Sequence, residues 1–136
     1  MTTTSATARA VGSWLAAALA TVALAAALGW LPTRRLGGEA ALVGLAAGCA
    51  VALAGAALGA APVLVAVARG GGRSHVVAGW AMALRSGATL VGALVGALGG
   101  AVPRTAFLAW VAIGYGALLV VETKWMLRWL AAGGRQ

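Results

Sequence analysis

Residues 40–68, AALVGLAAGCAVALAGAALGAAPVLVAVA, form an uncharged apolar segment that decides the fold class. A helix needs about 20 apolar residues to cross the hydrocarbon core of a bilayer, because each residue adds about 1.5 Å of length. This segment is long enough to cross at a tilt, and Pro62 is expected to kink or end its regular part. We therefore predict a membrane-spanning helix here.

The composition of the whole chain agrees with a membrane protein. Hydrophobic residues make up 62% of the 136 residues and charged residues 9%, whereas a soluble domain carries about 25% charged residues. The length predicts a single membrane domain over residues 1–136, with the lipid bilayer as its main partner. The net charge of +8 does not indicate a nucleic-acid partner, because long apolar stretches separate the charges.

Three more segments have the length and apolar character of membrane spans. They cover residues 10–31, 76–102 and 105–130, and none shows the strand alternation of outer-membrane barrels. The expected connections, at residues 32–39, 70–74 and 103–104, are short. Short connections make neighbouring helices antiparallel, so we predict an all-α integral membrane four-helix bundle with up-down topology.

The positions of Lys and Arg predict the orientation, because cytoplasmic loops of membrane proteins are enriched in both. With both termini cytoplasmic, the inside carries six basic residues and the outside three. Trp residues near span ends are expected to anchor the helices at the membrane interfaces. The inside set is Arg9, Arg69, Arg73, Lys124, Arg128 and Arg135, the outside set is Arg34, Arg35 and Arg104, and the Trp set is Trp14, Trp30, Trp125 and Trp129.

Glycines recur at helical spacing in two of the expected spans. Such small-residue stripes let helix backbones approach closely, so we interpret them as packing faces. The number of Gly-x-x-x-Gly pairs is close to chance for a chain with 21 Gly, and only the shared helical phase carries information. Whether the faces meet a helix of the same chain, a second copy or another protein stays open. The stripes are Gly44, Gly48, Gly55 and Gly59, and Gly92, Gly96 and Gly100.

Arg85 is the most specific signal, because a charge deep in a membrane span is costly and indicates a special role. It shares a helical face with Thr89, Gly92 and Gly96 of the third span. Glu122 lies in the fourth span at about the same depth, and Tyr115 precedes it on the same face. We expect Arg85 and Glu122 to pair, with Tyr115 and Thr89 as supporting polar groups. The alternative is that both charges reach the cytoplasmic headgroups separately, as Lys124 is expected to do.

Catalytic and metal-binding patterns are not recognisable. Cys49 stands alone in the second span, where a packing role is expected, and His75 stands alone at the start of the third. One His, one Cys and two Glu do not make a convincing metal cluster. We therefore expect no enzymatic activity, no metal site and no cofactor.

From about residue 38, the chain resembles the ATP synthase protein I family of small four-span bacterial membrane proteins. The resemblance lies in GGEAALVGLAAGCAVALAGAALG (37–59), WAMALRSGATLVGALVG (80–96) and FLAWVAIGYGALLVVETKW (107–125). It implies a multi-pass protein of the bacterial inner membrane that assists assembly of the rotor ring of c subunits in F-type ATP synthase. Arg85 matches the basic position of the third span, and Glu122 a position where a polar residue is common.

The resemblance also implies an alternative function, transport of a small cation such as magnesium or calcium, or of another small solute, with Arg85 and Glu122 in the pathway. The family often has a carboxylate shortly before the basic residue, where this chain has Met82, Ala83 and Leu84. That difference removes an oxygen ligand that a hard cation needs. We expect the assembly role, with c subunits as partners and homo-oligomer formation open.

Overall fold

The computed structural model describes residues 3–69 and 75–133, and all regular structure in them is helical. The helices are α1 (Thr3–Ala68), α2 (His75–Leu98) and α3 (Arg104–Gly133). All three are long and apolar enough to cross a membrane, by length and composition. The expected connection at residues 70–74, and the basic residues Arg73 and Arg135, lie outside the described residues.

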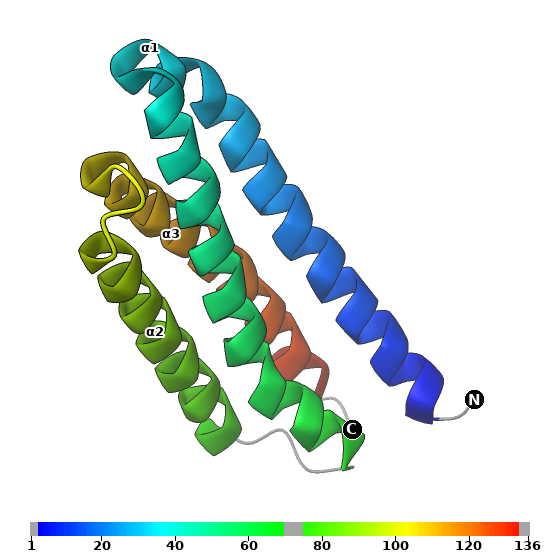
Figure 1. The fold of residues 1–136 in the computed structure, drawn as a ribbon. Coiled ribbons are helices and arrows are strands. Elements are labelled where there is room, and N and C mark those ends of the chain that lie inside the picture. Colours follow the sequence, from blue (N-terminus) through cyan, green and yellow to red (C-terminus); the bar gives the residue numbers. More distant parts are fainter. Residues whose placement is uncertain (1–2, 70–74, 134–136) are drawn as a thin grey trace.

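The prediction of four separate helices is wrong, because the first two expected spans belong to the single helix α1. The expected loop at residues 32–39 is helical apart from Gly38, whose backbone has φ 66° and ψ −160°. Glycine adopts this positive φ without the steric penalty that a Cβ atom brings. One residue therefore bends α1 into a first arm (residues 3–37) and a second arm (residues 39–68), which fold back on each other in Figure 1.

Of the two outcomes expected for Pro62, a kink or an end of the regular helix, the end does not occur. Both Pro32 and Pro62 lie inside α1, which continues to Ala68. A proline inside a helix leaves one carbonyl four residues earlier without its donor, but neighbouring helices and local adjustments make this tolerable in apolar helices. The two prolines therefore do not interrupt α1, whereas Gly38 bends it.

The third and fourth expected spans correspond to α2 and α3 with small changes at their ends. α2 ends at Leu98 rather than at residue 102, and α3 begins at Arg104, directly after Pro103. Gly100 has a φ of 68° in the connection between them. It is therefore a turn residue, and the expectation that it belongs to a packing stripe is wrong.

The second arm of α1 is the centre of the bundle. α1 contacts both α2 and α3 extensively, whereas α2 and α3 contact each other much less (Figure 1). One apolar cluster joins the two arms of α1 to α3. Its buried members are Trp14, Ala18 and Val22 of the first arm, Leu45, Cys49, Ala52 and Ala56 of the second arm, and Trp110 and Leu118 of α3.

The glycine stripes pack against helices of the same chain. A Cβ atom built on Gly48 would lie 2.9 Å from the Phe107 carbonyl oxygen and 2.9 Å from the Val111 amide nitrogen of α3. Built on Gly59, it would lie 2.7 Å from Arg85 Cβ of α2. Gly44 likewise faces α3, Gly55 faces α2, Gly92 faces Val51 of α1, and Gly96 faces Phe107 of α3.

A buried hydrogen bond holds the first arm of α1 against α3 near the bend. Trp110 Nε1 donates to Thr33 Oγ1 at 3.0 Å. The indole ring occupies the space beside Gly29, where an added Cβ would lie 1.7 Å from the ring. The hydrogen bond satisfies two polar groups that would otherwise be costly to bury.

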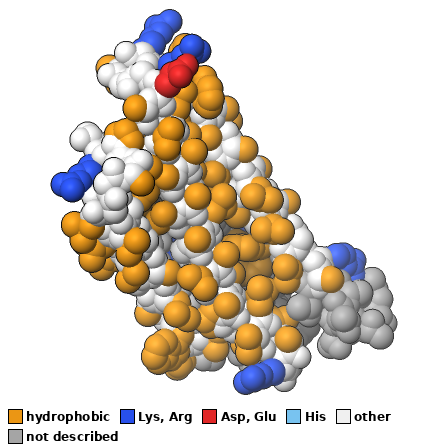
Figure 2. Space-filling view, in the orientation of Figure 1, with side chains coloured by type: hydrophobic (Ala, Val, Ile, Leu, Met, Phe, Trp, Pro, Cys, Tyr) orange, Lys and Arg blue, Asp and Glu red, His pale blue; other side chains and the backbone are white. Residues whose placement is uncertain are grey.

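The outer surface is apolar along the helices and charged toward the ends. Large exposed side chains include Leu24, Leu28, Val76, Leu90, Val95, Leu98 and Leu127. In Figure 2, hydrophobic side chains cover most of the drawn face, and basic side chains gather toward the two ends of the molecule. A surface of this kind suits contact with lipid chains.

We predict that Gly48→Ala destabilises the bundle by about 1–3 kcal/mol, because the added methyl group would meet backbone atoms of α3 that cannot turn aside. Gly87→Ala is the matched control, since nothing lies within 4 Å of a Cβ atom at that position of α2. The control is expected to be neutral or slightly stabilising. Unfolding of both purified variants in detergent measures the difference, and equal stability would contradict the packing described here.

Candidate functional site

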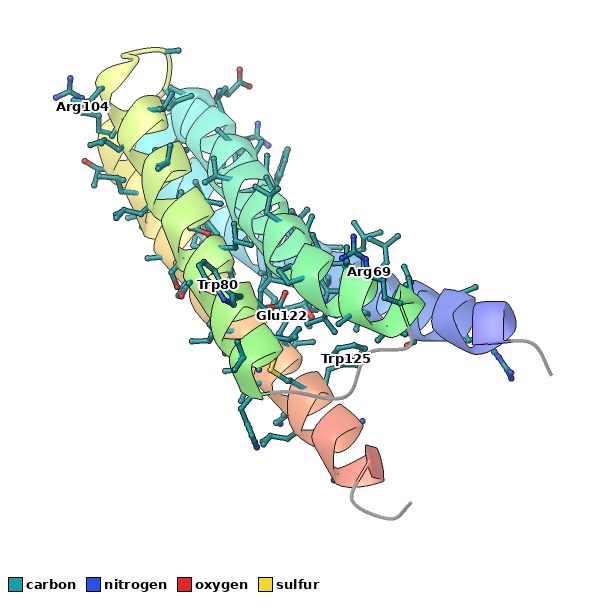
Figure 3. The ribbon with its side chains drawn as sticks, turned by 90° about the horizontal axis from the view of Figure 1, so that it is seen from below. Arg69, Trp80, Arg104, Glu122 and Trp125 are labelled. Carbon is teal, nitrogen blue, oxygen red and sulfur yellow. The ribbon has the colours of Figure 1, made fainter. Side chains whose placement is uncertain are left out.

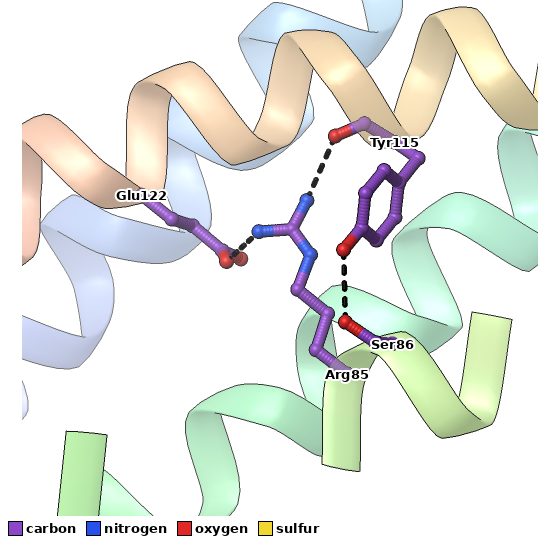
Figure 4. Close-up of polar contacts among 4 residues, drawn as sticks. All are labelled: Arg85, Ser86, Tyr115 and Glu122. Atoms are coloured by element: carbon purple, nitrogen blue, oxygen red, sulfur yellow. Dashed lines mark hydrogen bonds and ion pairs between the residues drawn. The ribbon is translucent and has the colours of Figure 1, made fainter. Parts of the chain in front are cut away.

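The candidate site is an ion pair between α2 and α3. Arg85 Nη1 donates a hydrogen bond to Glu122 Oε2 (Figure 4). The exposed fraction of the side chain is 1% for Arg85 and 13% for Glu122. The structure thus brings together the two charges that the sequence analysis expected to pair, and places them inside the bundle rather than at its surface.

Tyr115 contributes to the site in a different way from the one expected. Its backbone carbonyl oxygen accepts a hydrogen bond from Arg85 Nη2 at 3.0 Å. Its ring lies beside the guanidinium group, with Arg85 Cζ 4.8 Å from the ring centroid. Its hydroxyl group is hydrogen-bonded to Ser86 Oγ at 2.9 Å (Figure 4). Together with the Arg85–Glu122 hydrogen bond, these two hydrogen bonds give three polar contacts between α2 and α3 at this level.

Thr89 is buried but does not join the polar cluster. Its Oγ1 has no hydrogen-bond partner among the described residues. This oxygen lies at the place where Gly55 has no side chain, 2.1 Å from the position that a Cβ atom would take there. Thr89 therefore serves the contact between α1 and α2 rather than supporting the Arg85–Glu122 pair.

A small cavity adjoins the ion pair, and the side chains of Trp14 and Trp125 form part of its wall. Its volume is about 30 Å³, and Glu122, whose Oε1 lacks a hydrogen-bond partner among the described residues, is one of its lining residues. Glu122 and Trp125 are seen together from below in Figure 3. A volume of this size holds about one or two water molecules and no larger solute. The lining includes Trp14, Val63, Met82, Arg85, Glu122, Trp125 and Met126.

The chemistry open to this site is limited by its composition. A hard cation such as magnesium or calcium takes about six or more oxygen ligands. The carboxylate of Glu122 has one oxygen bound to Arg85 and one left, and no group of three or more His, Cys, Asp or Glu side chains occurs in the part of the chain that the structure describes. The arrangement is therefore suited to holding two helices together.

Of the other predicted site residues and anchors, Trp14 and Trp125 line the cavity beside the pair, whereas Lys124 and His75 do not. Lys124 is exposed, as expected of a side chain that reaches for the membrane surface, and His75 is exposed at the start of α2. Trp14 is buried, which contradicts its expected role as an interfacial anchor. The side chain of Trp129 lies outside the described residues.

Sequence reasoning missed Ser86 and the Thr33–Trp110 hydrogen bond. Ser86 directly follows Arg85, so its position beside the charged residue was the available signal. Thr33 and Trp110 are 77 residues apart, and neither residue stands out in its own segment. A contact of this kind depends on how the arms of α1 pack on α3, which no local pattern reports.

We predict strong coupling between Arg85 and Glu122 in a double-mutant cycle. Arg85→Met and Glu122→Leu should each destabilise the protein by about 3–5 kcal/mol, because each leaves one charge buried without its partner. The double variant should be less destabilised than the sum by about 1–3 kcal/mol. Unfolding in mixed detergent micelles measures the four free energies.

The control for this cycle combines Arg104→Met with Glu39→Leu, two charges that are exposed in the structure. Each control change is expected to stay within about 0.5 kcal/mol, and the two effects should add. Additive effects of Arg85→Met and Glu122→Leu would contradict an energetic role for the ion pair.

Comparisons with protein-family models, with curated proteins and with solved structures find no match to this chain. The function of the chain is therefore inferred from its residues, from the geometry of the site and from its resemblance to the ATP synthase protein I family.

Proposed function

We propose that the chain is a multi-pass membrane accessory protein, placed in the bacterial inner membrane with both termini cytoplasmic, that assists assembly of the c-subunit rotor ring of F-type ATP synthase. The observation that supports a non-enzymatic, structural role is the Arg85–Glu122 pair. Its charged groups bind each other and the Tyr115 carbonyl, and the adjoining cavity is too small for a solute larger than water. The c-subunit client follows from the resemblance to the ATP synthase protein I family.

The glycine stripes of the second and third expected spans are not the surface we propose for client binding, because helices of the same chain cover them. An open small-residue face remains on the outside of α2. Nothing lies within 4 Å of a Cβ atom built on Gly79 or Gly87, and the exposed Ala83 lies between them on the same helical face. A shallow groove over this face is bordered by Trp80, Leu84 and Val91. We propose that Gly- and Ala-rich hairpins of c subunits contact α2 here.

The alternative function is transport of a small cation or another small solute through the site of Arg85 and Glu122. One observation favours it: Glu122 lines the small cavity and its Oε1 has no hydrogen-bond partner among the described residues. Two observations oppose it. The Arg85 guanidinium already balances the carboxylate charge, and the cavity offers too few oxygen ligands for a hard cation.

We predict that co-expression with the c subunit of a bacterial F-type ATP synthase increases the yield of assembled rings, and that c subunit co-purifies with the tagged chain. Gly87→Leu should reduce both, because the larger side chain fills the open face of α2. Gly116→Leu is the matched control on α3, where a Cβ atom also meets nothing within 4 Å.

Ring yield on native gels and quantified co-purification measure this prediction. Unchanged ring yield without the chain, together with no co-purification, would rule out the assembly role. Ion flux in proteoliposomes that is abolished by Glu122→Gln would instead favour the transporter alternative.

A further inference from the structure

The two ends of the bundle differ in whether an exposed acidic side chain accompanies their basic side chains. The chain has only two acidic residues, Glu39 and Glu122. Glu39 directly follows the bend of α1 and is exposed at that end of the molecule. Glu122 is turned inward onto Arg85. Among the described residues, the end at which α1 begins and α3 ends therefore has no exposed Asp or Glu side chain.

Besides Arg9 near the start of α1, three exposed basic side chains at the ends of α1 and α3 share that end. Arg69 directly follows α1, and Lys124 and Arg128 lie on the last part of α3. Figure 1 shows the end of α1 and the end of α3 on the same side of the molecule as the termini, and Figure 3 shows Arg69 and Arg104 at opposite ends. Because Glu122 is engaged inside the bundle, these three charges keep their full attraction for an anionic surface.

The depth of these residues fits the headgroup region of a leaflet. From Arg104 to Arg128, α3 is about 36 Å long at about 1.5 Å per residue, slightly more than the hydrocarbon core of about 30 Å. Arg128 therefore lies at headgroup level when Arg104 lies at the opposite surface. Lys124, one helical turn earlier, reaches the same level through its flexible side chain.

We propose that the end of the bundle bearing Arg69, Lys124 and Arg128 binds the headgroups of anionic phospholipids in one leaflet. This inference rests on the membrane embedding in the proposed function but not on the rotor-ring client. The expected partner is a lipid with net negative charge, such as a phosphatidylglycerol, in preference to a zwitterionic lipid of the same chain length. Each basic residue near the surface strengthens attraction to an anionic leaflet by about fivefold, so anionic lipids are expected to gather at this end.

The test uses the full chain, reconstituted in nanodiscs made from equal parts of phosphatidylglycerol and phosphatidylcholine and then extracted mildly. Mass spectrometry of the retained lipids gives the ratio of the two lipids bound. We expect phosphatidylglycerol to be enriched on the unmodified chain and largely lost from the variant R69Q/K124Q/R128Q. The matched control R34Q/R35Q/R104Q removes the same number of exposed charges from the end that also carries Glu39, and it should keep most of the enrichment.

A further variant, R69K/R128K, preserves the charges and should retain the lipids, which separates loss of charge from loss of folding. Helix content and thermal unfolding of each variant identify any that do not fold. Equal loss of enrichment in the two triple variants, or no enrichment on the unmodified chain, would overturn the proposal. Because no c subunit is present, failure here leaves the assembly role to be judged by ring yield.

Discussion

The ion pair between Arg85 and Glu122 is the constraint on which the arrangement of α2 and α3 depends. These helices make few other contacts with each other, and the hydrogen bonds of Arg85 to Glu122 and to the Tyr115 carbonyl join them at one level. A charge buried in a low-dielectric environment is costly without its partner. The two helices must therefore lie at the depth and rotation that bring these groups together.

Small residues on α1 make that arrangement possible. The second arm lies between α2 and α3, and its glycines allow both helices to approach its backbone. Gly59 leaves room for the base of the Arg85 side chain, and Gly48 leaves room for the backbone of α3 near Phe107. The same close approach that packs the bundle also covers the ion pair, so the packing and the electrostatics of the site depend on the same residues.

The sequence was sufficient to place the apolar helices and the two charges, because hydropathy and helical periodicity are local properties. Arg85 and Glu122 were expected to meet because both lie about five residues from the centre of their spans on the same side. A connection between the first two spans was expected at residues 32–39, but its restriction to the single residue Gly38 was not, since hydropathy does not report a positive φ. Burial of Trp14 and the partners of the glycines depend on how separate helices pack, so they required the structure.

Glu122 points inward and pairs with Arg85, so it leaves no acidic side chain at the nearby surface. The same pairing helps to decide between an assembly protein and a transporter. An ion passing through the site would have to displace Arg85 from the carboxylate, leaving the buried guanidinium with the Tyr115 carbonyl and ring but without a counter-charge. The other described side chains around the cavity, among them Trp14, Met82 and Met126, include no second carboxylate that could bind the displaced guanidinium. Breaking the ion pair is therefore costly. The intact pair fixes α2 against α3 and keeps Glu122 from neutralising the basic side chains Lys124 and Arg128 at the end of α3. A stable bundle with a charged end and an apolar exterior fits a protein that holds other membrane helices better than one that moves ions.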